Sequence, residues 1–262
     1  MSETTLEIVG TDKNVALITV MRSGKRNALS DALIEELHHT FRNLPKEAKA
    51  AVLTGDGEHF CAGLDLSELR ERDAAEGIFH SRRWHAAFED IQFGLVPVIS
   101  ALKGAVVGGG LELASATHIR VADKTTFYAL PEGSRGIFVG GGGSVRIPRI
   151  IGVSKMTDMM LTGRVLNAQE GYESGISQYL VEPGKSLEKA LEIASRVAQN
   201  APLTNYSVTH ALPRIADQTM TEGFMTEAFI SAIAQSAPEA KARLRAFLDD
   251  KANKVQRPDQ AK

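Results

Sequence analysis

The sequence predicts an α/β protein whose last third is helical, and three observations support this. Short aliphatic runs alternate with segments that carry apolar residues at helical spacing, which is typical of strands alternating with helices. From about residue 141 onward nearly every segment has the helical pattern. A chain of 262 residues with 43% hydrophobic and 24% charged residues can bury the large core that such a fold needs.

The first elements are expected in the order hairpin, helix, strand. Residues 6–9 and 15–21 are apolar runs on either side of the turn sequence GTDKN, and they predict two strands. Ser30 is a good N-cap for the helix that follows, which ends before Pro45. Its apolar residues recur at helical spacing: Leu33, Leu37, Phe41 and Leu44. The apolar run at residues 50–55 then predicts a buried strand.

The middle of the chain predicts one long helix, a buried strand and a short buried helix. The long helix ends near Phe93, and Gly77 is expected to interrupt it. Residues 96–107 read VPVISALKGAVV and predict a single strand, and residues 111–116 predict a short helix after the glycines. Two more strands are expected in the sequences HIRVAD and TTFYAL.

The remaining segments predict helices with one short strand among them. The helices are expected at residues 141–152, 154–163, 167–175, 186–197, 203–215, 221–235 and 238–249, and the strand at 177–182. Residues 253–262 are expected to fray as a C-terminal tail.

Composition and charge exclude several classes of function. The formal net charge of -2 does not favour nucleic acid or an anionic membrane as a partner. Cys61 is the single cysteine, which excludes an intrachain disulfide and favours a reducing compartment. No apolar run approaches the roughly 20 residues of a spanning helix, and the N-terminus lacks the pattern of a signal peptide. We therefore expect a cytoplasmic protein that binds neither nucleic acid nor membrane.

Several familiar nucleotide-binding, nucleophile and metal-binding motifs are absent from the sequence. The sequence VGGGGSVR at 139–146 lacks the Lys-Ser/Thr pair of a phosphate-binding P-loop, and neither glycine run fits the dinucleotide fingerprint G-x-G-x-x-G. Ser144 does not lie in a G-x-S-x-G nucleophile turn. The seven histidines show no metal-ligand spacing. We expect no metal site and no nucleotide cofactor.

Two glycine-rich turns indicate a site for a developing negative charge. Gly108 to Gly110 follow a predicted strand and lead into a helix, and residues 60–66, FCAGLDL, have the same design. Such turns expose the unpaired N–H groups of a first helical turn. Brought together, the two turns could form an oxyanion hole in which each donor contributes about 2.7–4 kcal/mol. Asp65 is expected to cap its helix, and Cys61 to pack as a small hydrophobe.

Two glutamates accompany these turns. Glu112 lies one turn after the glycines, and Glu132 follows Pro131 at the end of a predicted strand. Taken singly, each could be an ordinary helix-terminal or surface carboxylate. As a pair beside an activated carbonyl they suggest proton transfer, because burial and mutual repulsion separate their pKa values. We favour Glu112 as base and Glu132 as acid, although coupled carboxylates leave that division open.

Four motifs in order resemble the crotonase (enoyl-CoA hydratase/isomerase) superfamily. They are RSGKRNAL, HFCAGLDLSEL, KGAVVGGGLELASATHIRVA and FYALPEGSRGIFVGGGGSVRIPRIIG, and the resemblance extends from about residue 6 to 255. It implies an α/β crotonase-like spiral of ββα units with a helical C-terminal region. It implies a core at residues 1–200 that holds the acyl-CoA site, and a helical trimerisation region at 201–262. The expected assembly is a homotrimer or a homohexamer built as a dimer of trimers.

The resemblance also implies roles for individual residues. The backbone N–H groups of Leu64 and Gly109 match the oxyanion hole, and Glu112 and Glu132 match the two catalytic glutamates. The backbone of Gly140 matches the position that holds the attacking water. The predicted coenzyme A contacts are Lys25, Arg26, Ala28, Ala62, Gly63 and Leu64. Coenzyme A is part of the substrate, so no separate cofactor is implied.

The implied activity is that of a hydro-lyase adding water across the Cα=Cβ bond of a short 2-enoyl-CoA. Within the family the chain is most similar to methylthioacryloyl-CoA hydratases of dimethylsulfoniopropionate breakdown. That similarity implies hydration of 3-methylthioacryloyl-CoA and thioester hydrolysis, which release methanethiol, acetaldehyde, carbon dioxide and CoA. The alternatives are a general short-chain enoyl-CoA hydratase, a Δ3,Δ2-enoyl-CoA isomerase, and a non-catalytic scaffold that binds CoA or RNA. Retention of both glutamates argues against the last two.

Overall fold

The structure is a computed structural model that describes residues 3–9, 14–68 and 71–249. The predicted turn at residues 10–13 and the predicted tail at 253–262 lie outside this part of the chain. The chain divides into two compact units, Met1–Gln199 and Asn200–Lys262. Each unit is described on its own below.

The first unit is built on two β-sheets. The larger sheet has the strand order β1-β2-β3-β4-β6-β9, and the smaller has the order β5-β7-β8. In the larger sheet only the β1–β2 hairpin is antiparallel. The strands are β1 (Thr4–Val9), β2 (Val15–Val20), β3 (Ala50–Gly55), β4 (Val98–Leu102), β5 (Ala105–Val107), β6 (Ile119–Asp123), β7 (Phe127–Ala129), β8 (Leu166–Asn167) and β9 (Tyr179–Val181).

Consecutive strands are shared between the two sheets. β4 and β6 lie in the larger sheet, whereas β5 and β7, which follow them in the chain, pair in the smaller sheet. A helix follows each pair: α3 (Gly109–Ala116) after β5, and α4 (Gly143–Ile151) after β7. This repeat of two strands and a helix places the starts of α3 and α4 after strands of the same small sheet.

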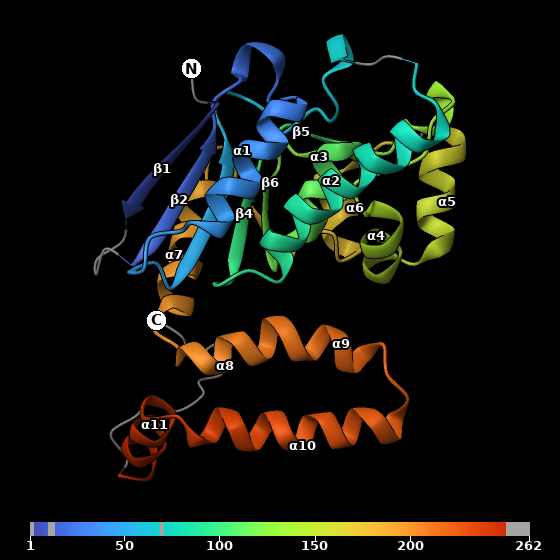
Figure 1. The fold of residues 1–262 in the computed structure, drawn as a ribbon. Helices are drawn as coiled ribbons and strands as arrows, with labels where there is room; N and C mark the ends of the chain where they lie inside the picture. The colour runs from blue at the N-terminus through green and yellow to red at the C-terminus, as the bar shows by residue number, and fades with distance from the viewer. Residues whose placement is uncertain (1–2, 10–13, 69–70, 250–262) are drawn as a thin grey trace. The chain divides into compact units, whose positions relative to one another are not determined.

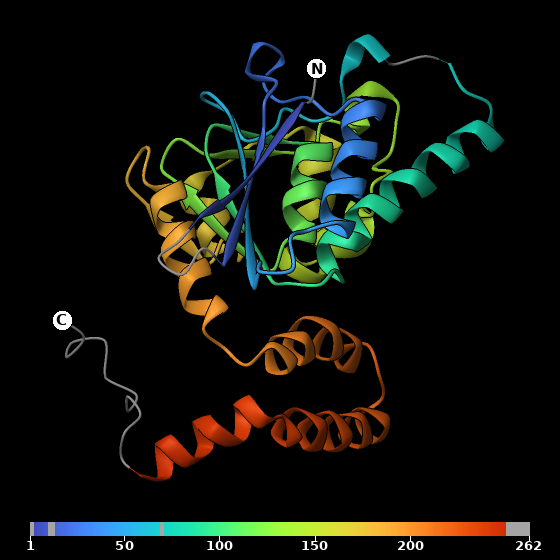
Figure 2. The same cartoon turned by 60° about the vertical axis from the view of Figure 1, so that its left-hand side comes forward.

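Helices cover both faces of the larger sheet, as Figures 1 and 2 show. The residues of β3 alternate between two cores, because side chains of a strand point to opposite faces. Val52 packs with Ile193 of α7 (Ser186–Ala198), whereas Leu53 packs in the core that includes α1 (Asp31–Arg42) and α2 (Ala74–Gln92). The remaining helices of this unit are α5 (Val153–Thr162) and α6 (Ala168–Glu173).

Two elements differ from the sequence prediction. α2 is not interrupted at Gly77, because the helix begins with a capping box between Asp73 and Glu76 and continues through the glycine. Residues 96–107 form two strands instead of one, since Gly104 adopts a positive φ of 52° after β4 and turns the chain into the smaller sheet. A side chain at Gly104 would also meet the Glu58 carbonyl oxygen at 2.4 Å.

The second unit is helical, as expected. It contains α8 (Pro202–Tyr206), a π-helical turn at Ser207–Ala211, α9 (Leu212–Ala216), α10 (Met220–Ser236) and α11 (Pro238–Leu248). The sequence predicts a single helix at 203–215, and the structure continues through that range with a π turn inside it. α10 contacts α8, the π turn, α9 and α11. Of the described residues of this unit, only five are buried: Ala201, Asn205, Thr209, Ala211 and Gly223.

Candidate active site

Glu112 projects from a helix that is buried along its whole length. All eight residues of α3, including Glu112, are buried, and Gly108 precedes the helix with a φ of 54°. A Cβ atom at Gly108 would lie 2.6 Å from Oε1 of Glu132. Glycine is therefore required here both for the backbone conformation and for the space that the second carboxylate occupies.

The Glu112 carboxylate accepts hydrogen bonds from the start of α4. Its Oε1 atom lies 2.8 Å from the backbone nitrogen of Gly141 and 2.8 Å from that of Gly143. Burial raises the pKa of Glu112, while the N–H groups of Gly143 and Gly141 and the charge of Arg146 oppose that rise. The carboxylate thus has specific donors for its ionised form, supplied by a helix N-terminus.

Glu132 has a different environment. It is 7% exposed and lies just before a short 3-10 helix at Gly133–Arg135. Its Oε2 atom is buried and has no hydrogen-bond partner in the described part of the chain. Burial raises the pKa of Glu132 to about 7, and the negative charge of Glu112 contributes to the increase. The two glutamates are therefore close enough to interact, and only the Glu112 carboxylate accepts hydrogen bonds from the start of α4.

The two predicted oxyanion turns lie side by side. Cys61 forms an isolated parallel bridge with Val106 of β5, and a Cβ atom on Gly63 would lie 3.4 Å from the backbone nitrogen of Gly109. Within residues 3–9, 14–68 and 71–249, neither the N–H of Leu64 nor that of Gly109 donates a hydrogen bond. Two neighbouring, unpaired N–H groups are what the binding of a single carbonyl oxygen needs.

Pairing with Leu29 determines which way the Leu64 peptide faces. The Leu29 N–H donates to the Gly63 carbonyl at 2.7 Å, and the Asp65 N–H donates to the Leu29 carbonyl at 2.8 Å. Backbone groups of successive residues point to opposite sides of an extended segment. The N–H of Leu64 therefore points away from Leu29.

The predicted coenzyme A contacts come from two adjoining segments. The Ala62 N–H donates to the carbonyl of Arg26 at 3.0 Å, so the segment that contains Lys25, Arg26 and Ala28 runs beside the 62–64 turn. Lys25 is half exposed, and its Nζ lies 2.9 Å from Asp65 Oδ2. The structure brings these segments together, and their contact with coenzyme A stays a prediction.

Three residues of the site were not identified from the sequence. Gly141 and Gly143 hold Glu112 through their N–H groups, and Arg146 donates to the Gly141 carbonyl at 3.0 Å. The glycine run at 140–143 is the sequence signal for these contacts, although the family resemblance implies a role for Gly140 alone. A Cβ atom at Gly140 would lie 2.9 Å from the Ser81 hydroxyl of α2, and its water-positioning role stays a prediction.

Other residues singled out in the sequence have structural environments. Cys61 is buried, and burial raises the pKa of its thiol to about 12, so it packs as a hydrophobe. Asp65 accepts hydrogen bonds from the N–H and hydroxyl of Ser67 at the start of a 3-10 helix, Leu66–Glu68. Among the described residues, no three His, Cys, Asp or Glu are grouped to hold a metal ion. No helix in the described segments is long and apolar enough to cross a membrane.

Comparison with protein families identifies the chain. Residues 10–256 match the family described as enoyl-CoA hydratase/isomerase. The chain belongs to the enoyl-CoA hydratase/isomerase family. Both glutamates and both oxyanion turns described above lie inside the matched region.

Relatives of known structure and activity class agree with this assignment. A solved structure from Rhodopseudomonas palustris CGA009, itself only provisionally called an enoyl-CoA hydratase, is 57% identical, with a TM-score of 0.91 and 95% of each chain covered. A 2,3-dehydroadipyl-CoA hydratase of Escherichia coli K12 and a short-chain-enoyl-CoA hydratase of Clostridium acetobutylicum are each 30% identical, covering 92% of this chain and 94% of the relative. The predicted crotonase fold is confirmed.

Proposed function

We propose that this member of the enoyl-CoA hydratase/isomerase family adds water across the Cα=Cβ bond of a 2-enoyl-CoA thioester. The observation that carries the proposal is the pair of buried glutamates, of which Glu112 has two backbone donors and Glu132 has an unpartnered oxygen. A hydration needs a base for the water and an acid for Cα, and unequal environments provide one of each.

The thioester carbonyl would be activated by the N–H groups of Leu64 and Gly109. Charge develops on the carbonyl oxygen when water attacks Cβ, so donors positioned at that oxygen stabilise the transition state more than the ground state. Gly63 and Gly108 keep the two peptides close, because a side chain at Gly63 would meet the Val107 carbonyl oxygen at 2.7 Å. The preorganised turns support this role.

The proton transfers follow from the two carboxyl environments. Glu112 accepts two N–H hydrogen bonds that favour its ionised form, so it would take the proton of the attacking water. The Oε2 atom of Glu132 is buried without a partner in the described chain, and burial raises the pKa of Glu132 to about 7, so Glu132 would hold the proton that is delivered to Cα. The Gly140 backbone, next to the donors of Glu112, would help to hold the water.

The test is consumption of crotonyl-CoA by the purified protein, followed by the loss of ultraviolet absorbance of the conjugated thioester. We expect hydration by the wild type and a loss of at least about 10²-fold in kcat for Glu112→Gln and for Glu132→Gln. A wild-type protein without turnover would refute the proposal. Conversion of a 3-enoyl-CoA without hydration would indicate the isomerase instead.

The identity of the acyl group is a finer proposal. We propose that the substrate is 3-methylthioacryloyl-CoA. Three segments support this by their resemblance to methylthioacryloyl-CoA hydratases: HSRRWHAAFEDIQF, FYALPEGSRGIFVGGGG and MTDMMLTGRV. The test compares kcat/KM for three substrates: crotonyl-CoA, 2,3-dehydroadipyl-CoA and 3-methylthioacryloyl-CoA. A thiol reagent detects the free CoA that thioester hydrolysis releases, and methanethiol is detected separately. A higher kcat/KM for another acyl group, or hydration without methanethiol, would reject this substrate.

We further propose that the chain assembles as a homotrimer or as a dimer of trimers. Helix α10 carries large apolar side chains that its own unit leaves exposed, among them Phe224, Met225, Phe229 and Ile233. Exposed apolar area of this kind favours association. A unit with so few buried residues would gain stability from association with another copy of the chain.

A further inference from the structure

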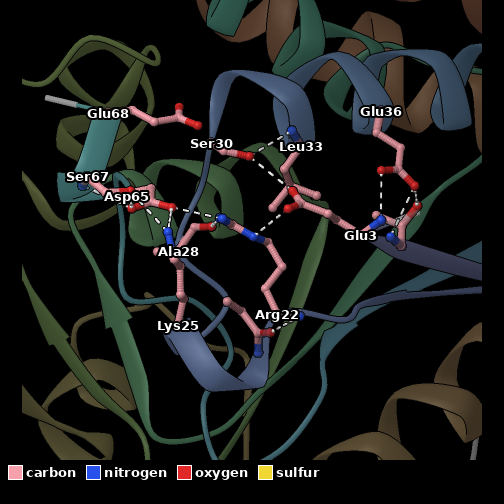
Figure 3. Close-up of polar contacts among 12 residues, drawn as sticks. Glu3, Arg22, Lys25, Ala28, Ser30, Leu33, Glu36, Asp65, Ser67 and Glu68 are labelled. Carbon is pink, nitrogen blue, oxygen red and sulfur yellow. Dashed lines mark hydrogen bonds and ion pairs between the residues drawn. The ribbon is translucent and has the colours of Figure 1, made fainter. Parts of the chain in front are cut away.

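A buried ion pair adjoins the peptide of Leu64. Nη2 of Arg22 lies 2.8 Å from Oδ2 of Asp65, and the two side chains are 11% and 5% exposed. Asp65 directly follows Leu64 in the chain. The interaction is drawn in Figure 3, where Arg22 lies between Asp65 and Glu3.

Arg22 joins three segments that are distant in sequence. Its Nε lies 2.8 Å from Oε1 of Glu3, its Nη2 contacts Asp65, and its Nη1 donates to the carbonyl of Ala28. Ala28 precedes Leu29, the residue that pairs with Gly63 and Asp65 on either side of Leu64. One guanidinium thus holds both segments whose pairing determines the direction of the Leu64 N–H.

The Asp65 carboxylate is saturated with donors. Oδ2 accepts from Arg22 and from Lys25, and Oδ1 accepts from the N–H and the hydroxyl of Ser67. The Ser67 hydroxyl, followed by Lys25, holds the pKa of Asp65 well below its usual range. The carboxylate therefore stays ionised at physiological pH, and a planar guanidinium bound to it has a single orientation.

We propose that Asp65 and Arg22 are positioning residues for the oxyanion hole, fixing the direction of the Leu64 N–H toward the thioester oxygen. The proposal rests on the proposed hydratase function. Neither residue touches the substrate in this role. They act through the Leu29–Leu64 pairing, and a small change in that pairing turns the donor away from the position where charge develops.

Loss of the Arg22–Asp65 interaction should weaken stabilisation of the transition state more than binding of the substrate. A misplacement of about 1 Å can reduce the rate about 10²-fold, and a lost oxyanion donor has a similar effect on kcat. Binding of the rest of the acyl-CoA does not depend on this donor, so KM should change much less than kcat. Hydrogen bonding to the carbonyl of a conjugated thioester also shifts its absorption to longer wavelength, which reports on the donor without turnover.

The experiment compares wild type with Asp65→Asn, Arg22→Met and Ser67→Ala. The readouts are kcat and KM for crotonyl-CoA, and the absorbance shift of cinnamoyl-CoA on binding. We expect kcat to fall about 10²-fold for the first two variants, with a smaller shift of the bound cinnamoyl thioester. Ser67→Ala removes one donor to Asp65 and should have an intermediate effect. The double variant Arg22→Met/Asp65→Asn should lose little more than either single variant, because the pair acts as a unit.

Glu36→Ala is the matched structural control. Glu36 accepts hydrogen bonds from the N–H of Glu3 and from the N–H and hydroxyl of Thr4, in the same region but on the other side of Glu3 (Figure 3). This variant should lose stability and keep kcat and the absorbance shift. An equal loss of kcat and shift in Glu36→Ala would show a general structural effect and refute the proposal.

Two other outcomes decide the question. Asp65→Asn with the kcat and absorbance shift of the wild type refutes the proposal. If Asp65→Asn does not fold, unchanged kcat and shift in both Ser67→Ala and Arg22→Lys refute it instead. A wild-type protein that hydrates no 2-enoyl-CoA refutes the proposed function separately, whatever the variants do.

Discussion

At the scale of single residues, two side chains of the same type have different surroundings. Glu112 accepts two backbone hydrogen bonds, whereas the Oε2 atom of Glu132 is buried without a partner in the described chain. Hydrogen bonds to a carboxylate favour ionisation, and burial without them favours protonation. The start of α4 therefore stabilises a negative charge on Glu112, whereas burial raises the pKa of Glu132 to about 7.

The pH dependence of hydration should reflect this arrangement. Burial raises the pKa of Glu132 to about 7, and a general acid must be protonated, so kcat/KM should fall as the pH rises through that value. Measurement of crotonyl-CoA hydration from about pH 5 to 9 checks the expectation. The alkaline limb should be missing from the residual activity of Glu132→Gln. Its persistence in that variant would assign it to another group.

The raised pKa of Glu132 also predicts how the stability of the protein depends on pH. The pKa of Glu132 is raised from 4.5 to about 7 in the folded protein, so between these values the folded state binds a proton that the unfolded state lacks. Stability therefore falls as the pH rises through this window and is about 3 kcal/mol lower above it. Urea unfolding at about pH 5 and pH 8 should show Glu132→Gln gaining stability over wild type at the higher pH only. An equal difference at both pH values would contradict this.

A glycine keeps room for the Glu112 carboxylate. A Cβ atom at Gly143 would lie 2.7 Å from Cγ and 2.8 Å from Oε1 of Glu112. Gly143→Ala should displace Glu112 and lower kcat by up to about 10²-fold while the protein stays folded. Gly77→Ala is the control, because nothing lies within 4 Å of its Cβ position in helix α2. It should keep full activity and gain at most about 1 kcal/mol.

At the scale of elements, the start of α4 acts as an anion-binding site for a side chain of α3. Gly143, the first residue of α4, donates to Glu112, and a helix N-terminus stabilises negative charge. Arg146, one turn later, donates to the carbonyl of Gly141 and to Oε1 of Gln92 in α2. The helix thus holds the carboxylate and, through its arginine, the loop that precedes it.

Removal of this arginine should disturb Glu112 from a distance. Arg146→Met removes the anchor of the 140–143 loop and a positive charge near Glu112, so kcat should fall by up to about 10²-fold. The pKa of Glu112 should rise and move the acid limb of the pH profile to higher pH, with Glu89 and His85 of α2 also facing Arg146. Arg149→Met, on the exposed side of α4, is the control and should keep the wild-type profile.

At the scale of the whole molecule, the two sheets position the candidate active site, and the helical unit carries exposed apolar side chains. The sheets place the starts of α3 and α4 and the 60–66 turn near one another, while the described part of the second unit carries many exposed apolar side chains. Phe229 of α10 is 62% exposed within the chain. Burial of such a side chain between subunits contributes about 1.5–3 kcal/mol.

A charged substitution on α10 should therefore change the assembly. Phe229→Asp is expected to shift the mass of the particle in analytical ultracentrifugation from a trimer or hexamer toward monomer, since a carboxylate is costly to bury unpaired. Phe229→Leu keeps the apolar character and should preserve the assembly. A wild-type protein that sediments as a monomer would contradict the proposed trimer.

The sequence alone predicted nearly all elements, the two glycine turns, both glutamates and the family, because each of these has a signature within a contiguous segment. Capping by Ser30, apolar spacing and strands of aliphatic residues are local features, and the structure agrees with them. The predicted interruption at Gly77 is wrong because helix α2 begins with a capping box and continues through that residue. The single strand predicted across Gly104 is wrong because the chain changes sheet there. Only the tertiary structure decided that the N–H groups of Gly141 and Gly143 bind Glu112, while Oε2 of Glu132 is buried without a partner in the described chain. Those hydrogen bonds join residues about thirty positions apart, and their geometry depends on how α3 and α4 follow neighbouring strands.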